Sequence, residues 1–453
     1  MRSRLGFIVM DSDVLVMGGG FAGLSAATLL AEKGKKVLVL EKKPHLGGRA
    51  YSFTDPKTGY EIDNGQHLFI GAYIETKKFL SRIGSSSLLR FSDKLTLHFK
   101  DALGQDDLLS APQALSSPID FTWGVLNLKH LSLKEKISAS KLMREAKKFK
   151  ADKDYAAQIE ALTIRQWLDR LGQTPNIQER LWEPLAIGIL NENAKTASAL
   201  GLIQALEKIL SKTPSDAAKT GYSKVGLSSL YTRQASDYIE KRGGQVLVSS
   251  KISSLIYENE RVCGVICEDG RQFRASSILL TLPPWDIKRL NVPQWLKTSL
   301  QAFSTSPIIG LSLWFDRPIT ENETTGLIQT RFHWVFNKNR IWNIPGPGQY
   351  LSLVISAAHE ELKKEPQEIL EIAKKELLVF PEFKKAKIIH WRLIKEPFAT
   401  PSPKPGLEKM RPFPGEVSPG LFLAGDWTRT GLPATIESAV MSGHKAAEVA
   451  LKN

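Results

Sequence analysis

The first strongly hydrophobic segment of the chain runs from Val14 to Ala31 and carries no charged residue. About 18 apolar residues is close to the shortest stretch that crosses a bilayer, so length alone favours a membrane anchor. The internal pattern favours another structure, because a strand-like run, DVLVM, is followed by Gly18, Gly20 and Gly23 and then by the helical run LSAATLLAEKG. Glycines at this GxGxxG spacing between a strand and a helix are typical of a phosphate-binding turn. We therefore predict a strand, a glycine-rich turn and a helix.

Each of the three glycines has its own predicted role in binding a dinucleotide. Gly18 allows the tight turn, Gly20 lets the backbone approach a pyrophosphate, and Gly23 lets the helix pack closely on its strand. The N-terminus of the helix then faces the phosphates. The alternative is a purely structural glycine-rich turn, and the residues that follow decide between the two.

The next hydrophobic run, KKVLVLE, has the continuous apolar character of a buried parallel strand and ends at Glu41. A carboxylate at this position accepts hydrogen bonds from ribose hydroxyls, which favours an adenosine ribose without a phosphate. Gly47, Gly48 and Arg49 then form a second glycine-rich turn with a cation. Because arginine suits a pyrophosphate, this turn strengthens the prediction of a dinucleotide site.

Farther along, apolar runs of strand length alternate with turns and helical stretches. Residues 243–284 predict an antiparallel hairpin, with turns at 258–260 and 269–270, that leads into a buried strand. Helical patterns dominate 112–210, and strand-like runs dominate 306–391. The last strand, GLFLAGDWT, precedes a C-terminal helix with Pro433 near its start, on which one face carries Ile436, Ala439, Val440, Gly443, Ala447 and Ala450.

The C-terminal strand and helix identify the cofactor as FAD. A strand that ends in Gly425 and Asp426 has no explanation if the ligand is only NAD, whereas the ribityl chain and isoalloxazine of FAD need a second anchor. Asp426 would accept a hydrogen bond from a ribityl hydroxyl or orient the pyrophosphate. The helix near Ala434, Thr435 and Ile436 would direct N–H groups at the flavin N1/O2 edge. The alternative for Asp426 is a helix cap or a turn at the strand end.

The predicted fold is therefore α/β, with a Rossmann-like FAD-binding domain of the glutathione reductase/amine oxidase type and an inserted substrate domain of mixed sheet and helices. A chain of 453 residues exceeds what one core usually supports. We expect the FAD-binding domain to comprise residues 11–85, 218–285 and 405–453. Residues 86–217 would form a helical, substrate- or membrane-facing region, and residues 286–404 the sheet of the substrate domain.

The net charge of +14, from 61 Lys+Arg against 47 Asp+Glu, favours an anionic partner. The apolar stretch IDFTWGVLNL, which contains Trp123, precedes a basic segment. This layout suits a segment on an anionic lipid surface, and the alternative is a solvated helix beside a core loop. Nucleic acid is not expected, since no motif that binds it accompanies the basic residues. They are Lys129, Lys134, Lys136, Lys141, Arg144, Lys147, Lys148, Lys150 and Lys153.

Several other classes of protein are excluded. Two cysteines cannot form a disulfide scaffold, and a reducing compartment is the natural fit. The eight histidines form no HxxxH or HExxH pattern, so no metal site is predicted, and neither a GxSxG elbow nor a GxxxxGK[ST] loop is present. The first ten residues are too short for a secretory signal, and either Met1 or Met10 suits the start. We expect a cytoplasmic protein held peripherally on the inner face of the cell membrane.

The motifs GGGFAGLSAATLLAEKG, VLVLEKKPHLGGRA, FLAGDWT and ESAVMSG together resemble the amine oxidase and phytoene desaturase superfamily of FAD enzymes. A narrower set, DNGQHLFIGAY, LWEPLAIGILNENAKTASA, SPIIGLSLWFDRPI and FLAGDWTRTGLPATIESAVMSG, is similar to the hydroxysqualene dehydroxylase family, also called squalene-associated FAD-dependent desaturases. LLSAPQALSSPID, at 108–120, departs from the family pattern by being more polar than the apolar run expected there.

The resemblance implies that reduced flavin removes the allylic hydroxyl of hydroxysqualene, which gives squalene for hopanoid or related triterpene synthesis. The substrate would be a lipophilic polyprenyl chain. Hydroxide is a poor leaving group, so an acid must reach the oxygen. Asp63 and His67 are the candidate catalytic acids, with Asn64 and Gln66 as orienting groups. Asp63 could instead contact the flavin or cap a turn, and His67 could be an ordinary buried histidine.

Three other functions stay open on sequence alone: a carotenoid desaturase, a flavin amine oxidase, and a redox-silent escort protein for prenylated partners. The electron donor for the flavin is not identified. The full set of predicted cofactor-binding residues is Gly18, Gly20, Phe21, Ala22, Gly23, Glu41, Lys42, Gly48, Arg49, Ile252, Gly425, Asp426, Ala434, Thr435 and Ile436.

Overall fold

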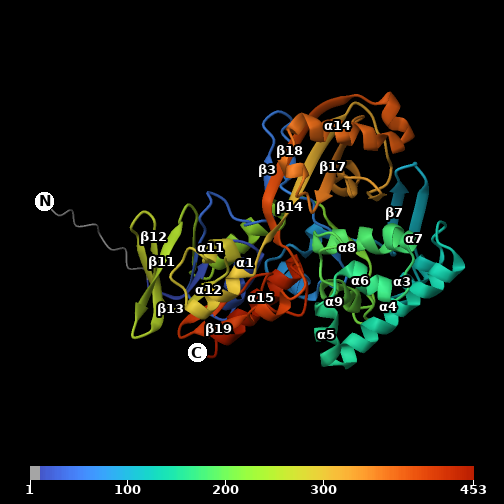
Figure 1. The fold of residues 1–453 in the computed structure, drawn as a ribbon. Helices are drawn as coiled ribbons and strands as arrows, with labels where there is room; N and C mark the ends of the chain where they lie inside the picture. The colour runs from blue at the N-terminus through green and yellow to red at the C-terminus, as the bar shows by residue number, and fades with distance from the viewer. Residues whose placement is uncertain (1–10) are drawn as a thin grey trace.

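The structure is a computed structural model and describes residues 11–453, apart from the side chains of Asp11, Lys150 and Lys153. Met10, and two lysines of the predicted basic segment, therefore lie outside the described part. Figure 1 shows three regions: one sheet with α1 and α15, a second sheet with β14 and β17, and a group of helices that includes α3, α4 and α9. The expected α/β architecture with an inserted second domain is confirmed.

The first sheet contains the predicted strand–turn–helix unit. Its parallel strands lie in the order β10 (Gln245–Leu247), β2 (Val37–Leu40), β1 (Asp11–Met17), β13 (Gln272–Leu280) and β20 (Leu421–Leu423). The early strands thus pair with strands from the middle and the end of the chain. This pairing brings the carboxyl ends of β1, β2 and β20 to one edge of the sheet, where ligands of open α/β sheets bind.

Helices α1 (Phe21–Glu32) and α15 (Ile436–Ala450) pack against each other beside this sheet. A Cβ atom on Gly443 would lie 2.3 Å from the carbonyl oxygen of Ala22, so this glycine permits the close approach. The predicted apolar face of α15 is buried, although the helix begins at Ile436, later than Pro433. The other elements of this region are α2 (Ile74–Arg82), α10 (Arg233–Glu240), β11 (Ile252–Glu258), β12 (Arg261–Cys267), α11 (Pro284–Ile287), α12 (Gln294–Gln301) and β19 (Gly415–Ser418).

The second sheet has seven strands in the order β18-β14-β17-β16-β15-β7-β8. On β14, Ile309, Leu311 and Leu313 are fully buried against a cluster that includes residues of α14 (Pro366–Glu376). The strands are β18 (Ile388–Pro401), β14 (Thr305–Phe315), β17 (Gln349–Ser356), β16 (Trp334–Asn337), β15 (Thr324–Ile328), β7 (Thr96–Asp101) and β8 (Asp106–Ser110).

A helical region packs against residues of β7, β16 and β17 through a continuous apolar cluster. Trp182 is buried there and donates its indole N–H to Gln173. The helices are α3 (Ile119–Leu126), α4 (Leu133–Ala151), α5 (Lys153–Glu160), α6 (Ile164–Arg170), α7 (Pro175–Ile177), α8 (Glu183–Leu190) and α9 (Ala199–Ile209). The strands β7 and β8 fall within 86–217, the range expected to be helical, and extend the second sheet through parallel pairing of β7 with β15. No helix within residues 11–453 is both long and apolar enough to cross a membrane.

Short strands connect the two domains. β3 (Ser52–Thr54) pairs with β4 (Glu61–Asp63), and β5 (Phe69–Ile70) pairs with β9 (Thr220–Ser223), which also pairs with β6 (Leu89–Phe91). The DNGQH motif lies between β4 and β5. The helix α13 (Lys338–Trp342) comes from the second domain and contacts β9 and β17. These connections place Asp63 and His67 where the two domains meet.

Candidate functional site

The first glycine-rich turn has the geometry that the GxGxxG spacing predicts. Gly18 has φ +111°, a conformation that side chains other than hydrogen rarely permit. A Cβ atom on Gly23 would lie 1.9 Å from the carbonyl oxygen of Gly18, which confirms that only glycine allows α1 to pack this closely on β1. At Gly20 a Cβ atom would meet nothing closer than 3.8 Å, so this position borders open space.

The second glycine-rich turn lies directly against the first. The N–H of Gly47 donates to the carbonyl oxygen of Gly19 at 2.8 Å. A Cβ atom on Gly48 would lie 3.2 Å from the Cα of Gly20. No side chain caps the N-terminus of α1, where Gly20 is the N-cap residue. The two turns therefore form a cradle of bare backbone at the positive end of a helix, which suits a pyrophosphate.

Tyr231, which sequence reasoning missed, contacts residues of both glycine-rich turns. Its hydroxyl lies 2.9 Å from the carbonyl oxygens of Gly47 and Ala50, and its ring stacks on Phe21 with 3.8 Å between centroids. Phe21 and Ala22 are buried, so only their backbone could face a ligand. The sequence held no clear signal for Tyr231, because it lies on a separate helical segment of the chain.

Glu41 sits at the carboxyl end of β2 and is 5% exposed. Its carboxylate accepts hydrogen bonds from the N–H groups of Gly19 and Lys43, each at 2.8 Å. Ile252 begins β11 and is partly buried in the apolar cluster on this side of the sheet. The side chain of Lys42 forms an ion pair with Asp286 at 2.6 Å. Glu41 therefore lies at the turn, as predicted, and Lys42 has a protein partner away from it.

Arg49 and Asp426 meet although they lie at opposite ends of the chain. The guanidinium Nη2 lies 2.5 Å from Asp426 Oδ1, and Nη1 donates to the carbonyl oxygen of Ala399 at 3.2 Å. The guanidinium also lies over the ring of Trp285, 5.4 Å from its centroid. The ion pair places the predicted cation of the second turn beside the predicted carboxylate of the C-terminal strand.

Arg411 shapes the loop after Asp426, and sequence reasoning did not identify it. This buried arginine donates hydrogen bonds to the backbone carbonyl oxygens of Asp426 at 3.1 Å, Trp427 at 3.2 Å and Leu432 at 2.9 Å, and also to that of Thr428. A guanidinium holds up to five donors in a fixed plane, so one side chain can fix a whole loop. Arg411 thereby sets the path of the chain between β20 and α15.

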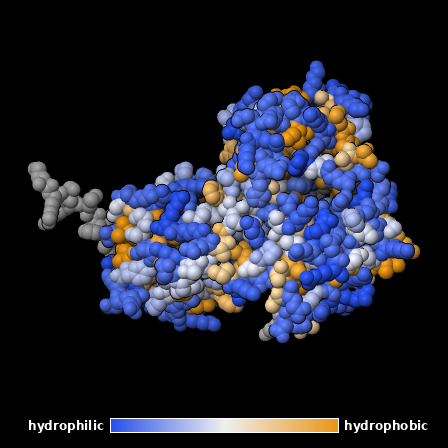
Figure 2. All heavy atoms as spheres, viewed as in Figure 1, coloured by the Kyte–Doolittle hydropathy of each residue, from blue (hydrophilic) through white to orange (hydrophobic). Residues whose placement is uncertain are grey.

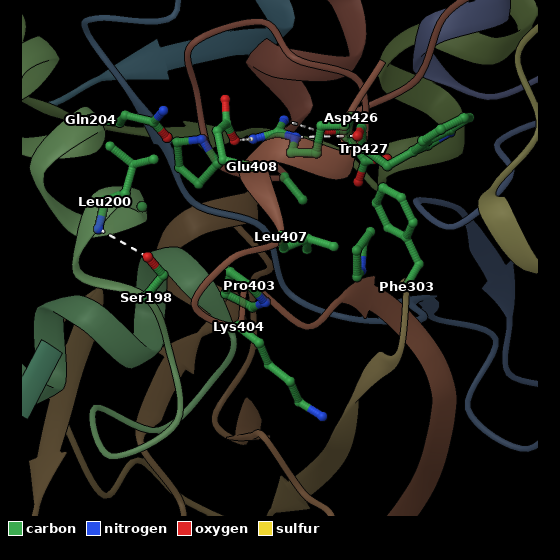
Figure 3. A pocket seen from close by; sticks show the side chains of 15 residues that line it. Ser198, Leu200, Gln204, Phe303, Pro403, Lys404, Leu407, Glu408, Asp426 and Trp427 are labelled. Carbon is green, nitrogen blue, oxygen red and sulfur yellow. Dashed lines mark hydrogen bonds and ion pairs between the residues drawn. The ribbon is translucent and has the colours of Figure 1, made fainter. Parts of the chain in front are cut away.

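The remaining C-terminal residues line the same region. Gly425 has φ +145° and donates its N–H to Ser442 Oγ at 2.8 Å. Thr435 caps α15 by accepting from the N–H of Ser438, and Ile436 is the first residue of that helix. Figure 3 shows a cavity lined by residues that include Asp426, Trp427, Phe303 and Leu200. Ala434 also lines this cavity.

Asp63 is held by three donors at the junction of the domains. Its Oδ1 accepts from Ser52 Oγ at 2.7 Å and from the N–H of Leu227 at 2.9 Å, and its Oδ2 lies 2.9 Å from Lys338 Nζ. Lys338 is 0% exposed and also donates to Gln66 Oε1 at 2.7 Å. The only sequence signal that Lys338 is buried was the apolar run WVFN that precedes it.

His67 lies beside this ion pair and differs from Asp63 in its partners. Within the described residues, no protein group forms a hydrogen bond with its ring, although surrounding protein lowers the pKa of the imidazole by desolvation. The residue nevertheless keeps part of its surface accessible. Asp63, Arg49 and Lys338 are all close enough to act on His67 electrostatically. The structure thus brings both candidate acids and the cation of the cofactor cradle together.

These residues fit FAD. The cradle offers bare backbone at Gly20 and Gly48 and leaves open space beside Gly20, where a pyrophosphate needs close approach. Arg49 supplies the cation, Glu41 the acceptor for a ribose, and Asp426 an acceptor at the opposite end. The assignment of individual residues to the cofactor stays a prediction, and their arrangement meets its requirements.

The chain is similar to several known proteins. It is 27% identical over 445 residues to the hydroxysqualene dehydroxylase of Zymomonas mobilis subsp. mobilis, covering 97% of this chain and 99% of that protein. It is 24% identical over 466 residues to the 15-cis-phytoene desaturase of an Oncidium hybrid cultivar, covering 97% of this chain and 78% of that protein. Its fold matches wild-type putrescine oxidase bound to putrescine with a TM-score of 0.74, 16% identity, and coverage of 98% and 100%.

The resemblance to the hydroxysqualene dehydroxylase family that the motifs predicted is therefore confirmed, at low identity. The likeness to phytoene desaturases is comparable. The family described as flavin containing amine oxidoreductase matches residues 21–451. That range begins just after Gly18 to Gly20 and contains the rest of both glycine-rich turns. It also contains the ion pair of Arg49 with Asp426 and the whole of α15. Since the match spans nearly the whole chain, the chain belongs to the flavin containing amine oxidoreductase family and is an FAD-dependent oxidoreductase.

Proposed function

We propose that this oxidoreductase removes the hydroxyl group of hydroxysqualene to give squalene. The observation that carries the proposal is the end-to-end similarity to a hydroxysqualene dehydroxylase, which extends over 99% of that protein against 78% of the phytoene desaturase. The accessible His67 at the domain junction supports it, because dehydroxylation needs a proton donor and hydrocarbon desaturation does not.

The reaction requires a hydride donor at the carbon that carries the hydroxyl group and a proton donor at the hydroxyl oxygen. Reduced FAD, when bound, supplies hydride. The C–O bond of the substrate breaks, the hydride forms a new C–H bond at that carbon, and the departing oxygen takes a proton and leaves as water. Each turnover consumes one hydride, so a separate electron donor is required to supply the next.

His67 is the proposed proton donor, and its geometry suits the role. Its ring has no hydrogen-bond partner in the described residues, so Nδ1 or Nε2 can reach the substrate oxygen. Asp63 is less suited, because all its neighbours at hydrogen-bond distance are donors and it therefore has no proton to give. Asp63 instead favours the protonated form of His67 by its charge.

The sheet next to His67 offers an apolar surface for a polyprenyl chain. Ile308 and Gly310 on β14 keep accessible surface, whereas their neighbours Ile309 and Leu311 are fully buried on the other face. A Cβ atom on Gly310 would lie 3.7 Å from the carbonyl oxygen of Asn64, so this strip lies beside the DNGQH motif. An apolar wall there excludes water from the reacting carbon.

An anaerobic experiment tests the direction of electron flow. The bound flavin is reduced and hydroxysqualene is added; the proposal expects the yellow colour to return, with squalene as the product. In parallel, oxidised enzyme is mixed with phytoene. If reduced enzyme stays colourless with hydroxysqualene while phytoene bleaches oxidised enzyme, the function is that of a carotenoid desaturase instead.

We also propose that the enzyme docks on an anionic membrane through α3 and α4, where its lipophilic substrate would dissolve. On α3, Trp123 is 47% exposed, and on α4, Leu133 and Ile137 are 71% and 59% exposed. Figure 2 shows hydrophobic side chains at the outer tip of the helical region. Exposed basic side chains farther along α4 include Arg144 and Lys147. This combination of apolar and basic groups suits an anionic lipid surface.

Vesicle flotation tests the docking. Replacing Arg144 and Lys147 with glutamate should release the protein from vesicles of anionic lipid, and Trp123→Ser should weaken binding to both anionic and neutral vesicles. The control makes the same change of charge at the exposed Lys384 and Lys387, which lie just before β18 of the second sheet, and should bind like the unaltered protein. Equal loss in the control would show an effect of net charge alone and would refute a specific docking surface.

A further inference from the structure

Lys338 is a fully buried lysine at the start of α13. Its Nζ donates to Asp63 Oδ2 at 2.9 Å and to Gln66 Oε1 at 2.7 Å, and it lies 3.4 Å from the ring centroid of Trp342. An ammonium group has three donor hydrogens, and these three contacts account for them. Lys338 is therefore placed to hold protein groups and has no free direction toward a substrate.

The contacts of Lys338 lead to both candidate acids. Through Asp63 it fixes the end of β4, and through Gln66 it reaches the backbone of His67, since Gln66 Nε2 donates to the carbonyl oxygen of His67 at 3.2 Å. Asp63 is further held by Ser52 and Leu227. A single buried cation thus connects the second domain to the whole segment from Asp63 to His67.

We propose that Lys338 is a positioning residue of the proton-donating site, which holds the Asp63 carboxylate beside His67 and fixes residues 63–67 so that the imidazole of His67 faces the substrate. This inference deepens the proposed dehydroxylation and rests on it for its catalytic meaning. The arrangement of the residues is independent of which substrate binds.

The electrostatic consequence follows from the charges around His67. Asp63 raises the pKa of the imidazole, whereas burial, Arg49 and, more weakly than Asp63, Lys338 lower it. Without Lys338, the buried carboxylate of Asp63 has no counter-ion and is no longer held in its place beside His67. His67 then loses the stronger influence of the carboxylate together with the weaker influence of the ammonium. The pKa of His67 should therefore be lower without Lys338 than in the unaltered protein.

Other charged groups near the pair do not replace Lys338. Glu61 acts on Lys338 from β4 and accepts hydrogen bonds from Gly226 and Ser229. Glu396 on β18 accepts from Asn64 Nδ2 at 3.2 Å. Arg49 already forms an ion pair with Asp426. In the described residues, Lys338 is the one cation within ion-pair distance of Asp63.

The test is a histidine titration of the FAD-loaded protein by NMR with ¹³C-labelled histidine. The chain has eight histidines, and the signal that disappears in His67→Gln identifies His67. The pKa of His67 is then measured in the unaltered protein, in Lys338→Met, in Lys338→Arg, and in the exposed-site control Lys387→Met. No substrate is needed, so the result does not depend on the proposed reaction.

Lys338→Met should lower the pKa of His67 by roughly 0.5 to 1 pH unit, and Lys338→Arg, which keeps the charge, should shift it less. Lys338→Met combined with Asp63→Asn should match Lys338→Met alone, since the carboxylate is already displaced from His67 in that variant. An unchanged or raised pKa in Lys338→Met would overturn the inference. If Lys338→Met does not fold, Lys338→Leu takes its place, since it removes the same charge from the same buried position, and an unchanged or raised pKa of His67 there would overturn the inference as well.

The pH profile of flavin reoxidation by hydroxysqualene connects the titration to the reaction. In Lys338→Met its descending limb should move to lower pH together with the pKa of His67. If the pKa of His67 shifts in Lys338→Met but hydroxysqualene does not reoxidise the flavin even in the unaltered enzyme, the proposed function is refuted and the role of Lys338 stands. If reoxidation occurs but its pH profile is the same in Lys338→Met as in the unaltered enzyme, the role of Lys338 is refuted and the function stands.

Discussion

Substitution by alanine should have different effects at two glycines of the first turn, Gly20 and Gly23. An added methyl group at Gly20 would have Gly48 Cα at 3.8 Å and Gly47 O at 3.9 Å as its nearest neighbours, which is ordinary contact. At Gly23 it would lie 1.9 Å from Gly18 O and 2.7 Å from Thr281 Oγ1. Gly20→Ala should therefore leave the fold intact and obstruct the cofactor, whereas Gly23→Ala should damage the fold itself.

The expected size of each effect follows from these distances. Overpacking against backbone at Gly23 should cost about 3 kcal/mol, and the better helix propensity of alanine recovers about 1 kcal/mol. The net loss of about 2 kcal/mol corresponds to a fall in Tm of roughly 2 °C for a chain of this length. For Gly20→Ala, alanine at a helix N-cap costs the apoprotein at most about 1 kcal/mol. Its affinity for FAD should fall about 100-fold, which is roughly 2.8 kcal/mol of binding free energy.

The assay separates the two effects by removing the flavin first. Thermal unfolding of the apoproteins measures the fold, and quenching of FAD fluorescence on titration measures the affinity. A Gly20→Ala variant that binds FAD as tightly as the unaltered protein would refute the assignment of this turn to the pyrophosphate. A Gly23→Ala apoprotein with an unchanged Tm would refute the packing argument.

Three further predictions concern the surroundings of the site. Arg49→Met should weaken FAD binding at least about tenfold by removing the cation of the cradle, while Arg49→Lys should retain part of the affinity, as a fluorescence titration would show. Tyr231→Phe should lower the free energy of unfolding by about 1 to 2 kcal/mol, measured by urea titration, because the carbonyl oxygens of Gly47 and Ala50 lose its hydroxyl. Burial lowers the pKa of His333 to about 4, and its Nδ1 accepts the N–H of Ser356. Since the unfolded pKa is about 6.5, the stability that this neutral histidine contributes is complete above about pH 6.5 and is lost as pH falls through about 4. The midpoint of unfolding by urea should decline as the pH is lowered from about 6.5 to about 4, and it should decline less steeply in His333→Gln.

Local pattern was sufficient for the elements of the cofactor domain. The strand–glycine–helix unit, the strand that ends at Glu41, the hairpin turns at 258–260 and 269–270, and the buried face of α15 are all present as predicted. Each depends on residues within about one or two turns or strands of one another, where hydrophobic period and glycine conformation act directly. The strands β7 and β8 were missed because their place in the second sheet depends on pairing with β15, more than 200 residues later.

The sequence alone identified the cofactor turn, the C-terminal carboxylate and the DNGQH motif as candidate chemistry, since the residue types and their spacing already carry that meaning. Only the tertiary structure decided which of these groups meet. It joined Arg49 to Asp426 across 377 residues and placed Lys338 on Asp63 across 275 residues. It also distinguished the two candidate acids, because Asp63 is surrounded by donors while the ring of His67 has no hydrogen bond in the described part of the chain. Contacts of this kind depend on how strands order themselves in a sheet and how domains dock, and hydrophobic periodicity along the chain carries no information about either.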